Sequence, residues 1–204
     1  MSPKSADSRE QQAESIARDV LDGRTSLLEL VDQIRPDKAS PQAIALKLIS
    51  EEKPEMLYGY WDFLADLIAS DNAFVQFIAI HALANLTAVD TEDKFEDTLD
   101  AYYDLLDDKS VMIASHVAGN SGRIAKAKPG LRARITQRLL EIDNTHRDPG
   151  RKGLVKAYAI ESFDQYFEDA EDQAKITDFV RAQLQSESPK AQKRAKQFLQ
   201  RWEL

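Results

Sequence analysis

The sequence predicts an all-α protein built from about five stacked helix pairs, and three observations carry this prediction. Throughout the 204 residues, apolar side chains recur at spacings of three and four, and no stretch alternates with the period of two that is typical of a half-buried strand. Five of the seven prolines stand where such a segment should begin, which is the helical position that proline favours. Similar apolar segments also return at regular intervals along the chain.

The repeat is clearest between residues 75–86 and 155–166, where Val, Ala and Ile recur in place at an offset of 80 residues. Residues 116–121 match residues 81–86 at an offset of 35. The alanines that occupy the same phase in each copy are Ala45, Ala79, Ala114, Ala159 and Ala195. Their spacing of about 34–45 residues is the period of helical solenoids.

Each repeat is expected to contain two helices, the second of which carries the repeated alanine, and a leading helix near residues 8–21 precedes them. The first helices are expected at residues 25–34, 55–69, 91–107, 130–143 and 171–186. The second helices are expected at residues 41–52, 73–88, 109–127, 150–168 and 189–202. Ser and Asp just before a helix satisfy its free N–H groups, and the expected caps are Ser40, Asp71, Asp108, Asp148 and Ser188.

The composition bounds the class of protein. Apolar residues make up 43% and charged residues 30%, which is ordinary for a globular chain. Cysteine is absent, which excludes disulfides, thiolate metal sites and cysteine nucleophiles. The longest apolar stretch, residues 73–86, is too short and too polar to span a bilayer. We expect a cytoplasmic protein with one domain over residues 13–204 and a polar, disordered N-terminus over residues 1–12.

The charge is unevenly distributed. Residues 1–120 carry 23 acidic and 10 basic side chains, whereas residues 121–156 carry 10 basic and 3 acidic ones. The chain therefore contains a locally basic segment although its net charge is −8. The acidic residues between positions 90 and 108 predict either a solvated helix face or a surface for a basic partner.

One string of residues resembles a known class of repeat. The pattern Asp-x-x-x-Val…Ala-x-x-Ala-Leu-x-x-Leu resembles the second helix of a HEAT repeat, and its members are Asp71, Val75, Ala79, Ala82, Leu83 and Leu86. Residues 81–86 also resemble the third helix of an armadillo repeat, with His where Trp is usual. The resemblance implies a right-handed α-α superhelix of the HEAT/armadillo-like kind, and it is specific for architecture rather than for activity.

The phase of the second helices predicts which side chains line the concave surface of such a superhelix. Shifting by the repeat offsets gives a row of carboxamides, Asn85, Asn120 and Gln165. A carboxamide can both donate to and accept from a peptide backbone, and the armadillo resemblance implies this use. The alternative is that these amides bond neighbouring helices. The candidate residues for binding a protein or peptide are Phe77, His81, Asn85, His116, Asn120, Glu161 and Gln165.

A metal centre and an enzyme are not expected. Two histidines and a carboxylate in one row, His81, His116 and Glu161, are ligands that zinc or iron accepts. Adjacent helices, however, lie about 8–10 Å apart, and metal ligands must converge to about 2 Å from the ion. The chain also has no serine elbow and no His-Glu-x-x-His motif. We therefore expect no catalytic residues, no metal and no cofactor.

The basic segment, residues 123–156, keeps a second function open. Arg123, Lys126, Arg134 and Arg138 are the candidate residues for binding a phosphate or a nucleic acid. The acidic repeats before this segment oppose that function, because a nucleic-acid groove needs basic residues along several repeats. The favoured prediction is a non-enzymatic helical-repeat scaffold that binds a protein or peptide along its concave face.

Overall fold

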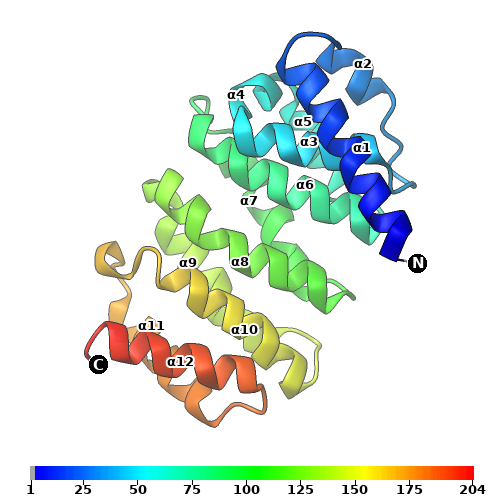
Figure 1. The fold of residues 1–204 in the computed structure, drawn as a ribbon. Helices are drawn as coiled ribbons and strands as arrows, with labels where there is room; N and C mark the ends of the chain where they lie inside the picture. Colours follow the sequence, from blue (N-terminus) through cyan, green and yellow to red (C-terminus); the bar gives the residue numbers. More distant parts are fainter. Residues whose placement is uncertain (1–2) are drawn as a thin grey trace. The chain divides into compact units, whose positions relative to one another are not determined.

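The computed structural model describes residues 3–204, with side chains from residue 8 onward, and this part of the chain is helical without any strand (Figure 1). The chain divides into two compact units, Met1–Phe95 and Glu96–Leu204. The periodicity did not indicate this division, because the chain passes from one unit to the next inside a continuous helix, α7 (Lys94–Asp104).

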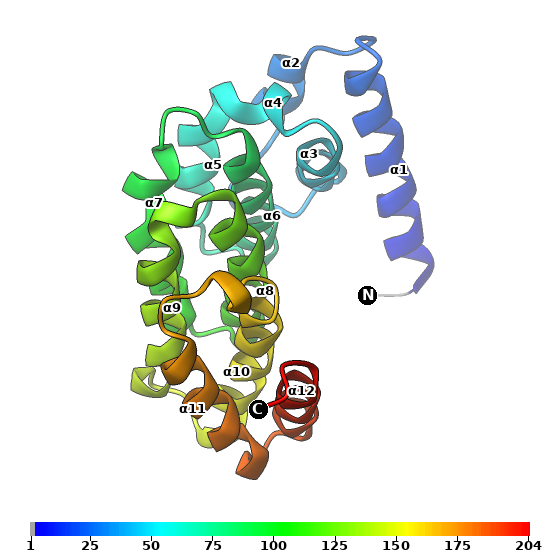
Figure 2. The same cartoon turned by 90° about the vertical axis from the view of Figure 1, so that its left-hand side faces the viewer.

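Within the described residues of the first unit, from residue 3 onward, the α-helices are α1 (Pro3–Leu21), α2 (Leu27–Asp32), α3 (Pro41–Glu52), α4 (Pro54–Leu57), α5 (Trp61–Leu67) and α6 (Ala73–Leu86). In this unit α3 packs between α1 and α6, and Figure 2 shows these three helices in that order. The helices α4 and α5 pack against α6. Residues 3–12, which were expected to be disordered, belong to α1, while residues 1–2 lie outside the described part.

The second unit holds most of α7 and five further helices, which are α8 (Val111–Ala127), α9 (Arg132–Leu140), α10 (Pro149–Phe163), α11 (Gln173–Ala182) and α12 (Pro189–Arg201). Here α10 packs between α8 and α12, so the second helices of three successive pairs lie side by side. The first helices α9 and α11 pack against each other in the adjoining layer (Figure 2). The predicted helices are therefore present with shifts of a few residues at their ends, except that the single helix expected at residues 55–69 is divided into α4 and α5 by a 3-10 turn.

The helix starts follow from side-chain caps. Three predicted caps are confirmed, since the side-chain oxygen of each accepts a hydrogen bond from the backbone N–H three residues later; they are Ser40, Asp148 and Ser188. The prediction for α6 is wrong by one residue, because Asn72 rather than Asp71 is the N-cap and accepts from the N–H groups two and three positions further on. Asp108 instead accepts from the backbone N–H of Ser110, the N-cap of α8.

The core confirms the repeat phase read from the sequence. Ala45 and Ala79 in the first unit are 0% exposed, as are Ala114, Ala159 and Ala195 in the second. Small side chains at these positions let neighbouring helices approach, and a larger residue would need the space that the adjacent helix occupies. The residues two positions after these alanines, among them His81, are at least partly exposed.

Candidate functional site

A groove lies in the first unit, where α1 and α6 lie on either side of α3. One cavity of this groove has a volume of about 310 Å³. Its apolar lining consists of Ile44, Leu48, Phe74, Phe77 and Ile78. Glu10 and Glu14 of α1 and Lys47 of α3 complete the lining. The cavity therefore combines an apolar floor with a charged rim.

Most of the apolar side chains in this cavity are only partly buried. The ring centroids of Phe74 and Phe77 lie 6.4 Å apart, and the ring of His81 lies 4.6 Å from that of Phe77. On the opposite face of α3, by contrast, Leu46 and Ile49 are 0% exposed. Partly exposed aromatic and aliphatic side chains that converge on one cavity form a surface that an apolar group of a partner would fill.

Helical periodicity explains why these residues share the groove. The α3 residues that line it are spaced by three or four positions and so fall on one face; they are Ile44, Lys47, Leu48, Glu51 and Glu52. The α1 residues that line it have a similar spacing; they are Glu10, Glu14, Ala17, Arg18 and Leu21. The groove therefore follows the length of both helices rather than a single turn.

The part of the groove toward the C-terminal end of α3 is acidic. A second cavity of about 510 Å³ shares Glu14 and Leu48 with the first. Its charged lining is Glu14, Arg18, Asp22, Glu51 and Glu52. Four carboxylates and one guanidinium therefore surround this cavity, and its field favours a positively charged group.

Two of these four carboxylates are neutralised within the unit. Lys47 Nζ lies 2.5 Å from Glu51 Oε1, and the carboxylate of Asp22 lies 2.7 Å from an arginine two residues later. Glu14 and Glu52 form no ion pair among the side chains of residues 8–204. Glu52 is also the last residue of α3, whose final turn carries no basic side chain. A carboxylate at this negative end of the helix dipole is unfavourable for stability.

Asn85 lies in a helix contact of the first unit. Its side chain is 6% exposed, and its Nδ2 donates a hydrogen bond of 2.8 Å to Ser50 Oγ, which links α6 to α3. The structure therefore puts this amide between helices and not on the open groove face that the helical phase predicted. Of the two roles considered from the sequence, the bond to a neighbouring helix is the one that this geometry satisfies.

The other two members of the amide row belong to the second unit. Asn120 is 6% exposed and is hydrogen-bonded to the side chain of Tyr102. Gln165 is exposed, and its Nε2 donates to the backbone oxygen of Glu161 at 3.3 Å. A Cβ atom placed on Gly122 would lie 2.6 Å from Gln165 Cδ, so the Gln165 side chain packs closely against this glycine.

The row of His81, His116 and Glu161 is divided between the two units, with His81 in the first. In the second unit His116 is half-buried on α8. Glu161 binds the last helix, since its Oε1 lies 2.6 Å from Arg194 Nε and 3.5 Å from Lys190 Nζ. Its carboxylate is thus engaged in holding α12 against α10.

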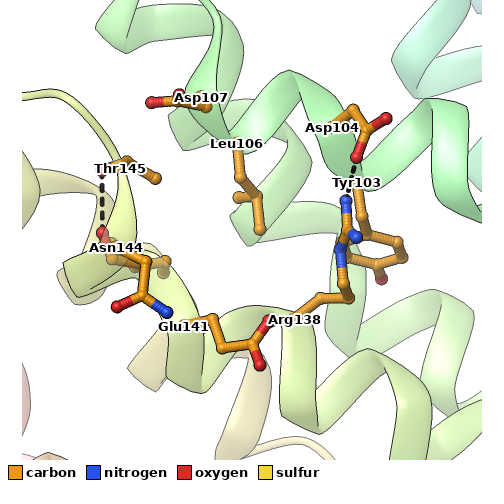
Figure 3. Close-up of a pocket in the computed structure, with 9 residues that line it drawn as sticks. Tyr103, Asp104, Leu106, Asp107, Arg138, Glu141, Asn144 and Thr145 are labelled. Atoms are coloured by element: carbon orange, nitrogen blue, oxygen red, sulfur yellow. Dashed lines mark hydrogen bonds and ion pairs between the residues drawn. The ribbon is translucent and has the colours of Figure 1, made fainter.

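The basic segment pairs with the acidic helix that precedes it. Arg134 of α9 lies 3.3 Å from Glu96 and 3.5 Å from Asp100 of α7. One turn later Arg138 forms an ion pair with Asp104, and Figure 3 shows its guanidinium reaching that carboxylate beside a cavity of about 180 Å³. The acidic face of α7 and the basic face of α9 therefore form exposed ion pairs with each other within the second unit.

The net charge of the whole chain resides in the first unit. Residues 1–95 carry 9 basic and 17 acidic side chains, a net charge of −8. Residues 96–204 carry 18 basic and 18 acidic side chains, a net charge of zero. Of the four candidate anion-binding residues, Arg134 and Arg138 are engaged in ion pairs, while Arg123 and Lys126 are exposed on α8.

A buried arginine fastens the loop between α9 and α10 to the end of α7. Arg147 is 7% exposed and donates to the backbone oxygens of Leu106 and Asp108. The neighbouring His146 donates its backbone N–H to Asp107 Oδ1 at 2.9 Å. Partial burial raises the pKa of the Asp107 carboxyl, but hydrogen bonds and charge from His146, with the charge of Arg147, outweigh it and hold this pKa below its ordinary value. These contacts are structural.

Sequence reasoning found part of the groove and missed the rest. Phe77 and His81 were predicted on an exposed helix face, and the structure brings them together at the edge of the apolar cavity. Glu10 was missed because the polar N-terminal residues were interpreted as disordered. Ile44 and Leu48 were missed because an apolar residue at helical spacing is more often core, and only their partial exposure distinguishes them.

Several features are absent from the described residues. No helix within residues 3–204 is long and apolar enough to cross a membrane. Among the side chains of residues 8–204, no three His, Asp or Glu residues gather closely enough to hold a metal ion. Comparison with known proteins finds no family model, no curated protein and no solved structure that matches this chain.

Proposed function

We propose that this chain is a non-enzymatic helical-repeat protein of the HEAT/armadillo-like superhelix kind that binds a protein or peptide in the groove of its first unit. The architecture is supported by the repeated alanines at 0% exposure and by the side-by-side packing of second helices within each unit. Binding is supported by one observation above all: the partly exposed apolar side chains of α3 and α6 converge on a cavity of about 310 Å³.

The proposal moves the binding surface from the amide row to the groove beside it. Asn85 and Asn120 are buried in helix contacts, whereas Phe77 lines the groove and the His81 ring lies beside the Phe77 ring. A phosphate or nucleic acid is less well supported, because Arg134 and Arg138 already pair with carboxylates. The net charge of −8 on the first unit also repels a polyanion.

A display selection tests the proposal without assuming the shape of the ligand. A library of random peptides is selected on the wild-type protein and counter-selected on Phe74→Ser/Phe77→Ser. We expect enriched peptides that bind the wild type and lose at least about tenfold in affinity on the double variant, because the apolar floor supplies most of the contact area. Circular dichroism and thermal unfolding confirm that the variant is folded.

Leu28→Ser is the matched control, since Leu28 is 55% exposed on α2 and does not line the groove. It removes an exposed apolar side chain from the same unit and should leave binding unchanged. A selection that enriches no peptide, or only peptides that bind Phe74→Ser/Phe77→Ser as well as the wild type, would show that the groove is not the binding site.

A further inference from the structure

The charge around the groove indicates what kind of peptide occupies it, and this inference rests on the proposed function. The apolar side chains lie toward the start of α3, at Ile44 and Leu48, and the carboxylates lie toward its end, at Glu51 and Glu52. A ligand that lies along the groove therefore first meets an apolar floor, with Glu10, Glu14 and Lys47 at its rim, and next meets an anionic surface. We infer that the occupant is an amphipathic helix with apolar anchors at one end of a face and Lys or Arg side chains about two turns away.

The spacing of the anchors follows from helix geometry. From Ile44 to Glu52 is eight residues of α-helix, which is about 12 Å at 1.5 Å per residue. A second helix lying along α3 covers the same length with side chains at positions i, i+4 and i+8. Apolar residues at i and i+4 then meet the aromatic cavity, and basic residues at i+7 and i+8 meet the acidic one.

The groove suits a helix better than an extended peptide. Its apolar cavity is lined by α1, α3 and α6, and its acidic cavity by α1 and α3 with Asp22. An amphipathic helix laid in a groove between helices is recognised through anchors at such spacings. An extended strand binds by adding to the edge of a sheet, and residues 3–204 contain no strand to receive one. The helix presents its apolar stripe while its own backbone groups stay hydrogen-bonded.

The charge balance selects a basic partner. Glu14 and Glu52 form no ion pair among the described side chains, and Glu14 lines both cavities. The first unit carries the whole net charge of −8, so its field attracts a cationic segment from a distance and repels an acidic one. Glu52 also stands at the unfavourable end of the α3 dipole, and a residue that breaks a local stability rule is expected at a functional site.

Synthetic peptides test this inference by fluorescence anisotropy on the full chain. The main probe is a labelled Ala- and Gln-based helix with Leu at i and i+4 and Lys at i+7 and i+8, and a companion carries the Lys pair before the Leu pair. We expect one of them to bind wild type, with an affinity that falls as NaCl rises from about 50 mM to about 500 mM. Glu14→Gln/Glu52→Gln should raise its Kd roughly three- to tenfold.

Matched controls separate charge at the groove from charge in general. Glu29→Gln/Asp66→Asn removes the same two charges from exposed positions of α2 and α5 and should change the Kd less than about twofold. A peptide with Glu in place of Lys should not bind. A peptide with proline at its centre should also fail, because proline breaks the helix.

Each contrary result has a distinct meaning. Equal affinity for the Lys and Glu peptides, or for the two charge variants, overturns the basic partner. Equal affinity of the proline peptide overturns the helix. Self-association in sedimentation velocity that Glu14→Gln/Glu52→Gln abolishes makes a second copy of the chain the occupant and overturns the inference. In all three cases the proposed function stands as long as display yields peptides that depend on Phe74 and Phe77.

Discussion

At the scale of single residues, we expect Asn85 to contribute to the stability of the fold and not to ligand binding. Its Nδ2 bond to Ser50 lies in the buried contact between α3 and α6. We expect Asn85→Ala to lower the free energy of unfolding by about 1–2 kcal/mol, because a buried hydrogen bond is lost and a void remains. Urea denaturation followed by circular dichroism measures this change.

A double-mutant cycle with Ser50→Ala assigns the loss to the pair. Ser50→Ala/Asn85→Ala should cost less than the two single changes added together, since the second change removes a partner that is already unpaired. Two outcomes would indicate that Asn85 contacts a ligand instead. One is that the losses in unfolding free energy of the two single variants are fully additive. The other is that Asn85→Ala leaves the unfolding free energy unchanged but abolishes peptide binding.

At Glu52 we expect the opposite, because this residue should support peptide binding and lower the stability of the fold. Glu52→Gln removes a negative charge from the C-terminal end of α3 and should raise the free energy of unfolding by about 0.3–1 kcal/mol. The same change should weaken the basic helical peptide. A thermal unfolding curve beside the anisotropy titration shows both effects in one variant. A Glu52→Gln protein that is less stable than wild type would contradict the dipole argument.

At the scale of elements, the attachment between α7 and the α9–α10 loop depends on one buried group. Arg147 is 7% exposed, whereas the side chains of Arg134 and its partner Glu96 are 44% and 58% exposed. We expect Arg147→Ala to lower the free energy of unfolding by about 2–4 kcal/mol, because the carbonyls of Leu106 and Asp108 lose their charged donors.

Arg134→Ala serves as the comparison and should cost at most about 0.5 kcal/mol, as solvent screens an exposed ion pair. Both values come from equilibrium urea denaturation of the full chain. Equal losses for the two variants would mean that the ionic row along α7 and α9, rather than the buried guanidinium, fastens these elements.

The positions of the helices were largely predictable from the sequence. Proline at the first turn, serine or aspartate before it, and alanine at a fixed phase each act locally. Their effects can therefore be predicted without knowledge of the fold. Asn72 replaced the predicted cap Asp71 because both side chains can cap, and only the direction of the incoming chain decides between neighbours.

The candidate site was less predictable, because exposure depends on which helix lies beside which. The phase of α6 placed Phe77 and Asn85 on related faces, but α3 covers Asn85 through Ser50 and leaves Phe77 at the groove. The pairing of the two charged helix faces was not predicted, for the same reason. From the sequence, the carboxylates of α7 and the guanidinium groups of α9 were interpreted as two separate exposed faces. In the structure they form ion pairs with each other.

At the scale of the whole molecule, the two units should differ in their resistance to alkali. Tyr102, Tyr103 and Tyr166 are at most 2% exposed and all lie in the second unit. Burial raises the pKa of each phenol well above its ordinary value. In the unfolded chain these phenols ionise near pH 10. Their stabilising contribution is therefore complete below about pH 10 and is lost as the pH rises further.

The two tryptophans report this difference, since Trp61 belongs to the first unit and Trp202 to the second. We expect the fluorescence of wild type to show an alkaline transition at lower pH than that of Trp202→Phe, which retains only Trp61. Tyr166→Phe should move the Trp202 transition to higher pH, because it removes one ionisable phenol. An earlier transition at Trp61 would contradict the expectation.

The side-chain bonds between helices have a consequence for how the chain folds. They join residues about one repeat apart: 32 positions for Tyr58 and Asp90, 35 for Asn85 and Ser50, and 37 for Arg201 and Asp164. The loops that these contacts close are therefore short, and their entropic cost is modest. During synthesis, the hydrogen-bonding partners of each new helix pair lie in the pair that was synthesised before it. Folding can therefore proceed while the chain is being translated.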